Sequence, residues 1–219
     1  MAYGYDGLGR LAWSGPSNSN YPTTFYVYDG DLLLGEVTTT LNGTQVQTSV
    51  TAAYTWGAAG LVSEKLSPAT NWPSSGTSLW YHFGPQGETR QLTNSSGNVV
   101  DTYVYTSWGE PGPVTGTDRN PFRYGGEFGY YTDPSATTGT ILCGARWYYP
   151  SIGRWLSRDP IGYKGGPNLY EYCHVDPVDW IDPHGTDEGP QRTQYRIDMN
   201  EEGGPDMHIY HRGGETNIT

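Results

Sequence analysis

The most regular feature of the chain is an aromatic ring that recurs at every second position just before a glycine-containing turn. Five segments share this order, and they are residues 3–11, 26–32, 54–61, 81–87 and 103–110. Because side chains alternate between the two faces of a β-strand, rings at alternate positions lie on one face. The Asp- and Gly-rich end of each segment favours a tight turn. The pattern predicts consecutive antiparallel hairpins that carry aromatic ladders.

Self-similarity of this kind is typical of repeat architectures, in which each unit packs on the next. The clearest hairpin signal is the strand-like segment 99–105, which follows the turn residues 95–98. An isolated hairpin is only marginally stable, so neighbouring units must stack to bury their rings. The chain shows no convincing amphipathic helix. We therefore expect an all-β fold, built from repeat hairpins that form part of a spiralling sheet shell.

The aromatic stripes also allow a second interpretation, in which exposed rings bind sugars. The rings concerned are Tyr26, Tyr28, Tyr103, Tyr105, Trp147, Tyr148 and Tyr149. Rings at alternate strand positions more often fill the interior of a sheet or pair across strands. The pattern therefore favours an internal ladder over a binding surface.

Composition narrows the class of protein further. The 219 residues include 31 glycines and 16 prolines, and only 16% are charged, which excludes a coiled coil or helical bundle. An aromatic content of 14% argues against disorder, and a net charge of −11 argues against a nucleic-acid partner. The chain has no apolar run that could span a membrane, and residues 1–13 lack a signal-peptide layout. The two cysteines, Cys143 and Cys173, leave open a disulfide or two buried thiols.

From Asn120 onward the chain becomes denser in specific motifs. The motifs are Asn-Pro-Phe-Arg-Tyr at 120–124, Ala-Arg-Trp-Tyr at 145–148, Gly-Arg-Trp-Leu-Ser-Arg-Asp-Pro-Ile-Gly at 153–162, Asn-Leu-Tyr-Glu-Tyr at 168–172 and Asp-Pro-His-Gly at 182–185. Through these motifs the chain resembles the Rhs/YD-repeat proteins over roughly residues 1–186. The resemblance implies YD repeats over 1–119, an Rhs repeat-associated core domain over 120–186, and a short variable segment over 187–219.

The resemblance also implies a self-processing activity. In that family the repeats form a β-sheet shell around a C-terminal effector, and the core domain acts as an intramolecular aspartyl protease. By motif position, the catalytic residues are Asp159 and Asp182, with Arg158 implicated in the same site. The cut falls between Thr186 and Asp187 and releases the variable segment. No cofactor and no metal are implied.

Aspartyl chemistry requires two carboxyl groups close enough to share a proton, one acting as base and one as acid. The same residues also have an ordinary structural interpretation, because Asp-Pro and Pro-x-Gly are common turn sequences in which aspartate caps the backbone. The chain departs from the family by placing Thr186 where leucine usually precedes the cut. Asp176 adds a third carboxylate near the last motif, and we expect it and Asp179 to be solvated turn residues. Arg158 either stabilises charge at the pair or binds a neighbouring acid or ring.

The last segment predicts a small hairpin or meander, because residues 194–199 and 207–211 alternate on either side of a glycine-rich turn. His208 and His211 suggest a metal pair, but residues three apart in a strand point to opposite faces. No further ligand completes a zinc set. The pattern therefore argues against metal binding.

The resemblance further implies partners and a location. Partners would be the remaining shell repeats of a longer chain, a second copy through open sheet edges, or an immunity protein for the C-terminal segment. The protein would be secreted or on the cell surface, within a polymorphic toxin system used in bacterial competition. Three alternatives stay open at this point: a non-catalytic structural module, a cell-surface adhesion module, and an orphan fragment of a larger Rhs protein.

Overall fold

The computed structural model describes residues 1–17, 23–42, 44–67, 76–116, 119–133, 139–186, 189–190, 194–199, 205–211 and 214–218. Side chains are described up to Thr186, except that of Asn42. Strands form four separate sheets, and the all-β prediction is confirmed. Among these residues the helical elements are short 3-10 turns, and none could cross a membrane.

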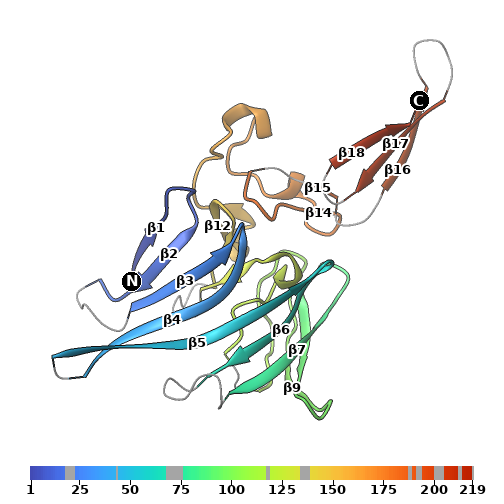
Figure 1. The fold of residues 1–219 in the computed structure, drawn as a ribbon. Coiled ribbons are helices and arrows are strands. Elements are labelled where there is room, and N and C mark those ends of the chain that lie inside the picture. Colours follow the sequence, from blue (N-terminus) through green and yellow to red (C-terminus); the bar gives the residue numbers. More distant parts are fainter. Residues whose placement is uncertain are drawn as a thin grey trace.

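A nine-stranded antiparallel sheet forms the first half of the chain, and each strand pairs with its neighbours in sequence. Figure 1 shows it as a strongly twisted and curved layer. Its strands are β1 (Ala2–Tyr5), β2 (Leu11–Gly15), β3 (Thr23–Asp29), β4 (Leu32–Asn42), β5 (Gln45–Gly57), β6 (Gly60–Leu66), β7 (Thr77–Phe83), β8 (Thr89–Thr93) and β9 (Val99–Thr102). The predicted hairpins are confirmed, because the first four ring pairs lie in β1, β3, β5 and β7.

A repeated turn explains why these segments fold back. In four hairpins the turn is closed by a glycine whose backbone N–H donates to the carbonyl three residues earlier. These glycines all have positive φ, and they are Gly9, Gly87, Gly97 and Gly109. A type I turn followed by a left-handed glycine matches the twist of paired strands, and a side chain at that position would be strained. The fifth ring pair uses the same turn, although Tyr105 forms only an isolated bridge, with Pro111.

Most rings of the alternating pairs lie on the inner face of the sheet and form its core, whereas Tyr5 of the first pair is exposed. Tyr54, Tyr81 and Tyr103 are buried there, together with leucines from the same face. Phe122 inserts edge-on against Tyr54, with ring centroids 4.8 Å apart. Tyr131 from the later segment packs on Phe122 at 5.8 Å. The internal ladder is therefore confirmed for these rings, and the later segment supplies the opposite side of the core.

The second half of the chain contains smaller sheets and short turns. A four-stranded antiparallel sheet is formed by β10 (Tyr131–Thr132), β11 (Ile141–Cys143), β12 (Arg146–Tyr149) and β13 (Arg154–Trp155). The 3-10 turns are η1 (Gly126–Phe128), η2 (Pro150–Ile152), η3 (Gly162–Gly165) and η4 (Cys173–Val175). Cys143 and Cys173 are buried free thiols, which decides between the two sequence-based alternatives.

The chain ends in two further small sheets. β14 (Trp180–Ile181) pairs with β15 (Gly189–Pro190). The last three strands form an antiparallel meander, as predicted, and they are β16 (Gln194–Met199), β17 (Pro205–His211) and β18 (Gly214–Ile218). The predicted domain boundaries after residues 119 and 186 stay a prediction.

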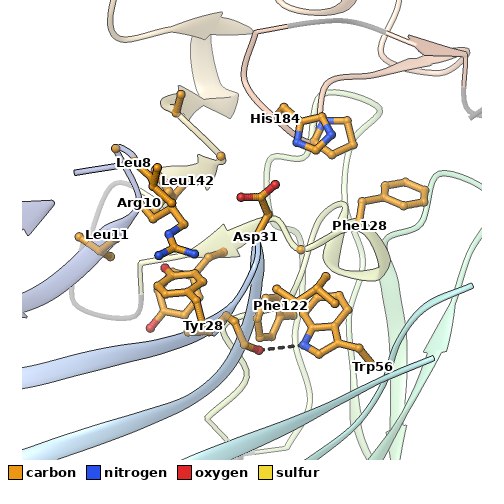
Figure 2. A pocket seen from close by; sticks show the side chains of 18 residues that line it. Leu8, Arg10, Leu11, Tyr28, Asp31, Trp56, Phe122, Phe128, Leu142 and His184 are labelled. Atoms are coloured by element: carbon orange, nitrogen blue, oxygen red, sulfur yellow. Dashed lines mark hydrogen bonds between the residues drawn. The ribbon is translucent and has the colours of Figure 1, made fainter. Parts of the chain in front are cut away.

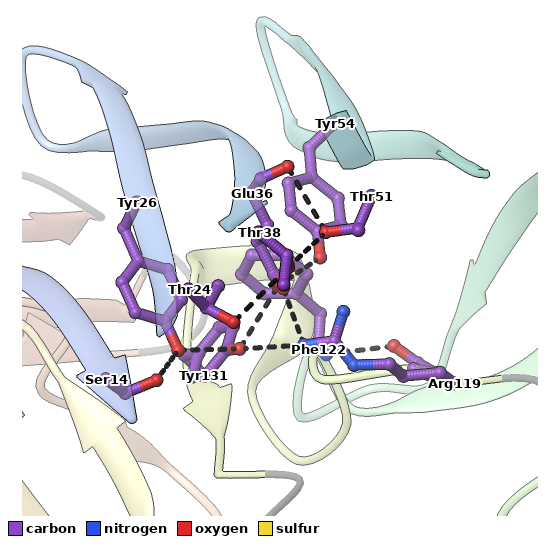
Figure 3. A network of polar contacts seen from close by, with 11 residues as sticks. Ser14, Thr24, Tyr26, Glu36, Thr38, Thr51, Tyr54, Arg119, Phe122 and Tyr131 are labelled. Carbon is purple, nitrogen blue, oxygen red and sulfur yellow. Dashed lines mark hydrogen bonds and ion pairs between the residues drawn. The ribbon is translucent and has the colours of Figure 1, made fainter. Parts of the chain in front are cut away.

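A buried carboxylate links the large sheet to the later segment (Figure 3). Glu36 on β4 is fully buried and lies 2.6 Å from the Nη2 atom of Arg119. The hydroxyl groups of Tyr54 and Tyr131 donate to its Oε1 atom at 2.7 and 3.1 Å. A buried charge is tolerated only with such partners. The network therefore holds residues 119–131 against the large sheet, at the start of the second half of the chain.

Replacing Tyr54 by phenylalanine is expected to lower the free energy of unfolding by about 1.5–3 kcal/mol, because Glu36 loses a charge-assisted hydrogen bond. Urea unfolding measures the change. The matched control is Tyr28→Phe, which alters a ring on the same face whose hydroxyl does not bind Glu36. The control should change stability by less than about 0.5 kcal/mol. Equal losses in the two variants would contradict a specific role for the Glu36 network.

Candidate functional site

The two aspartates singled out by sequence both contact one arginine, Arg146. Asp159 follows β13, and Asp182 follows β14, so sheet packing rather than sequence proximity brings them together. The Nη2 atom of Arg146 lies 3.1 Å from Oδ2 of Asp159 and 3.0 Å from Oδ2 of Asp182. The two carboxylates therefore share a single guanidinium nitrogen.

Arg146 reaches this position because of strand alternation. In β12, Arg146 and Tyr148 point into the core, whereas Trp147 and Tyr149 are half-buried on the other face. The guanidinium carbon of Arg146 lies 4.1 Å from the ring centre of Trp155, on the neighbouring strand β13. Side-chain exposure is only 2% for Arg146, 9% for Asp159 and 0% for Asp182. In so dry a place each charge depends on the others, because bulk water does not solvate them.

Each carboxylate also binds a backbone N–H through its second oxygen. Oδ1 of Asp159 accepts from the amide of Ile161 at 2.9 Å. Oδ1 of Asp182 accepts from the amide of Thr186 at 3.0 Å. Asp182 thus contacts Arg146 with one oxygen and, with the other, the residue that precedes the predicted cut.

Residues 182–186 form a turn, which we call the cleavage turn, and it is fixed to the β11–β12 hairpin. The Nε atom of Arg146 donates to the carbonyl of Gly185, and the amide of Ala145 donates to the carbonyl of His184 at 2.9 Å. Gly185 has φ +66°, and an added Cβ atom would lie 2.3 Å from the carbonyl oxygen of Cys143. Only glycine fits this close approach. Thr186 is therefore held beside Asp182, while Asp187 lies outside the described residues.

The thiol nearest to this site is not an activated nucleophile. Cys143 is fully buried, and burial, followed by the charge of Asp182, raises its pKa well above the usual value. Since only the thiolate is a strong nucleophile, this thiol is not a candidate reactive group. Among the side chains described, no three of His, Cys, Asp or Glu lie together as metal ligands. The side chains of His208 and His211 lie outside the described set.

Of the two interpretations left open for Arg158, the contacts of the described residues favour the second, in which it binds a neighbouring residue. Arg158 is exposed, and its Nε atom donates to the hydroxyl of Tyr170 at 3.3 Å. The arginine that contacts both aspartates is Arg146. Its position in the strand-like segment 145–148, two residues before a buried tyrosine, is a signal that could have identified it. An arginine on the buried face of a strand must find an acid.

The additional acid at position 176 behaves as a turn residue, as expected. Its Oδ1 atom accepts from the amide of Asp179 at 3.4 Å, and its carbonyl accepts from the amide of Trp180. Asp179 is exposed. Neither residue joins the pair at Arg146 in the contacts found.

A cavity of about 290 Å³ lies between the first hairpins and the cleavage turn (Figure 2). Its walls are mainly apolar and aromatic, with Arg10, Asp31 and His184 at its edge. Arg10 is already paired with Asp6 at 2.7 Å. Neither Asp159 nor Asp182 lines this cavity, although His184 of the cleavage turn does.

Comparison with known proteins shows which proteins the chain resembles in sequence. No family model matches the chain. The chain is 34% identical over 173 residues to the tRNA3(Ser)-specific nuclease WapA of Bacillus spizizenii, an alignment that covers 76% of this chain and 7% of WapA. It is 31% identical over 106 residues to the toxin protein Tse5 of Pseudomonas aeruginosa, covering 48% of this chain and 8% of Tse5. The chain belongs to the Rhs/YD-repeat proteins.

Solved structures agree with this assignment at the level of the fold. The crystal structure of TcdB2-TccC3 matches 84% of this Rhs chain and 10% of the larger chain, with a TM-score of 0.55 and 22% identity. The Photorhabdus luminescens Tc holotoxin pore matches the same shares with a TM-score of 0.56 and 21% identity. Because this Rhs chain spans 7–8% of the two curated relatives, their activities are properties of those proteins.

Proposed function

We propose that this Rhs chain is the C-terminal part of a toxin protein, whose core domain cuts its own backbone once between Thr186 and Asp187. The released product would be the segment 187–219. One relative named as a toxin protein and another named as a tRNA-specific nuclease support the toxin context. By the same resemblance, the protein would be secreted or displayed on the cell surface. It would assemble with further shell repeats, and an immunity protein would bind its C-terminal segment.

The proposal rests on the hydrogen bond between the side chain of Asp182 and the amide of Thr186, the first and last residues of the cleavage turn. The pair Asp159 and Asp182 meets at Arg146, and the amide of Thr186 binds directly to Asp182. The bond to be cut therefore follows a residue that the site already holds. A substrate fixed within the same chain reacts with a high effective concentration, so no separate binding pocket is needed.

The chemistry follows from two acids in different protonation states. One carboxylate removes a proton from water while the water oxygen bonds to the carbonyl carbon of Thr186, and the protonated acid gives its proton to the carbonyl oxygen. Collapse of this intermediate breaks the C–N bond, and the nitrogen of Asp187 leaves with a proton returned by the pair. One water is consumed, and a new carboxyl group and a new amine are formed. Arg146 holds the charged member of the pair in place.

A non-catalytic plug is the second candidate, and one observation favours it. Each aspartate has an oxygen occupied by a backbone amide, of Ile161 or Thr186, as expected for aspartates that cap turns. In this alternative, Arg146 and its two acids only close the end of the sheet structure. The two candidates differ in whether the chain between Thr186 and Asp187 is broken.

Intact-mass spectrometry of the purified full chain distinguishes them. We expect the wild-type chain to yield residues 1–186 and 187–219, whereas Asp159→Asn and Asp182→Asn slow the cut by about 10²–10⁴-fold. The matched control is Asp179→Asn, which changes an exposed acid three residues from Asp182 and should cut normally. A wild-type chain that stays intact, or an Asp182→Asn chain cut at the normal rate, would contradict self-cleavage.

A further inference from the structure

The backbone of Asp182 is held by a tyrosine side chain from a distant part of the chain. The amide N–H of Asp182 donates to the hydroxyl oxygen of Tyr130 at 2.8 Å. Tyr130 is 1% exposed and lies between η1 and β10. A hydroxyl group therefore takes the place that a strand or turn carbonyl acceptor would otherwise fill.

A second buried tyrosine fixes the first. The hydroxyl oxygens of Tyr130 and Tyr172 lie 3.1 Å apart, and both side chains are buried. Because the Tyr130 oxygen accepts the amide proton of Asp182, its own proton is available for the Tyr172 oxygen. Burial is the main cause that raises the pKa of both tyrosines well above the usual value, so both hydroxyl groups keep their protons.

The tyrosine pair is connected to the other side of the candidate site. The Tyr172 ring stacks on Tyr148 with centroids 4.0 Å apart and meets the Trp155 ring edge-on at 5.3 Å. Trp155 in turn lies under the guanidinium of Arg146. The contacts run from Asp182 through the two tyrosines and Trp155 to Arg146, which binds Asp182 again. The same aromatic side chains therefore hold both the backbone of Asp182 and the side chain of Arg146.

We propose that Tyr130 and Tyr172 are positioning residues, whose hydroxyl pair holds the peptide of Asp182 in the place required at Arg146 and the cleavage turn. The positional part of this inference is independent of self-cleavage, and its consequence for rate rests on the proposed function. Among the described residues, the hydrogen bonds of the tyrosine pair reach the cleavage turn at the backbone of Asp182. Their effect is exerted through Asp182.

The hydroxyl groups matter more than the rings in this role. Phenylalanine at position 130 keeps the packing volume but leaves the buried N–H of Asp182 without its acceptor. The turn must then shift to find another partner, and small displacements of reacting groups lower rates strongly. A tyrosine that only fills the core would tolerate the same change with no local effect on the turn.

Hydrogen exchange followed by NMR tests the positional claim without any cleavage. In full chains carrying Asp159→Asn, which keeps the backbone intact, Tyr130→Phe should speed exchange of the Asp182 and Thr186 amides at least about tenfold. The matched control is Tyr148→Phe, which removes a hydroxyl from the same ring cluster. That hydroxyl donates to the carbonyl of Trp108 at 2.8 Å, away from Asp182. Equal exchange of both amides in the two variants would overturn the inference.

Cleavage kinetics with native aspartates test the consequence for rate. Tyr130→Phe should slow the single-turnover cut about tenfold or more, while Tyr148→Phe, chosen for a similar loss of stability in urea, changes it less than about twofold. Tyr172→Phe should fall between them. If the wild-type chain does not cut, self-cleavage fails and the exchange experiment still decides the positioning role. If it cuts and Tyr130→Phe matches Tyr148→Phe, the positioning role fails while self-cleavage stands.

Discussion

Replacing Arg146 by methionine is expected to destabilise the folded chain by about 3–5 kcal/mol, the usual cost of removing one partner from a buried ion pair. Methionine keeps most of the length and apolar surface of the side chain but carries no charge. Asp159 and Asp182 would then face each other in a nearly dry site without the cation that both contact. The carbonyl of Gly185 would also lose its guanidinium donor. Urea unfolding monitored by circular dichroism gives the change directly.

A matched control and a mutant cycle separate charge from packing in this experiment. Arg154→Met changes an exposed arginine on the neighbouring strand β13 and should cost less than about 0.5 kcal/mol. Adding Asp159→Asn and Asp182→Asn to Arg146→Met should recover part of the loss, since the uncompensated acids are then gone. If Arg146→Met costs no more than Arg154→Met, the two aspartates do not depend on Arg146.

Raising the pH is expected to unfold the chain cooperatively, mostly between about pH 10.5 and pH 12. Burial is the first cause of a raised pKa in eleven tyrosines, and the five among them that are most deeply buried are Tyr54, Tyr81, Tyr130, Tyr131 and Tyr172. In the unfolded chain these groups lose their protons near pH 10, whereas the folded chain keeps them. Above that pH the unfolded state binds fewer protons, so stability falls by about 1.4 kcal/mol per pH unit for each tyrosine. Below it, both states are protonated and this loss is absent.

The size of the alkaline effect can be tested one tyrosine at a time. The five most deeply buried groups alone remove about 7 kcal/mol per pH unit, which approaches the whole stability of an ordinary domain, and the other raised tyrosines act in the same direction. Urea unfolding at several pH values should show a slope that is smaller by about 1.4 kcal/mol per pH unit in Tyr81→Phe. Tyr163→Phe changes a ring that is 78% exposed and should leave the slope unchanged. Tyrosinate absorbance that rises fully near pH 10, with the β-sheet signal intact, would contradict the prediction.

The hairpins of the large sheet were predictable because the information that forms them is local. Ring alternation over three residues and a glycine at the end of each turn are both visible in sequence, and together they specify strand, turn and inward face. The same pattern predicted that the rings are buried, and Tyr54 and Tyr81 do lie in the core on the inner face. The extent of each strand was less predictable. β9 ends at Thr102, before the ring pair Tyr103 and Tyr105, and the chain beyond it continues through isolated bridges instead of a regular strand.

The candidate site was only half predictable. Motif position indicated Asp159 and Asp182, and the structure places both at one guanidinium. The resemblance implicated Arg158, with binding to a neighbouring acid or ring as the open alternative, and in the structure Arg158 donates to the hydroxyl of Tyr170. Adjacent residues in an extended chain point in different directions, so proximity to Asp159 in sequence does not bring Arg158 to the pair. Arg146 contacts both acids because the register of β12 against β13 turns it into the core over Trp155.

The sequence by itself determined that this chain forms aromatic-lined β-hairpins with glycine turns, and that its motifs are those of an Rhs core. Only the tertiary structure decided that Arg146 joins the two aspartates, and that Tyr130 and Tyr172 hold the backbone of Asp182. The reason is physical: a hairpin depends on neighbours within a few residues, whereas a buried charge can be satisfied by any part of the chain that folding brings within about 3 Å.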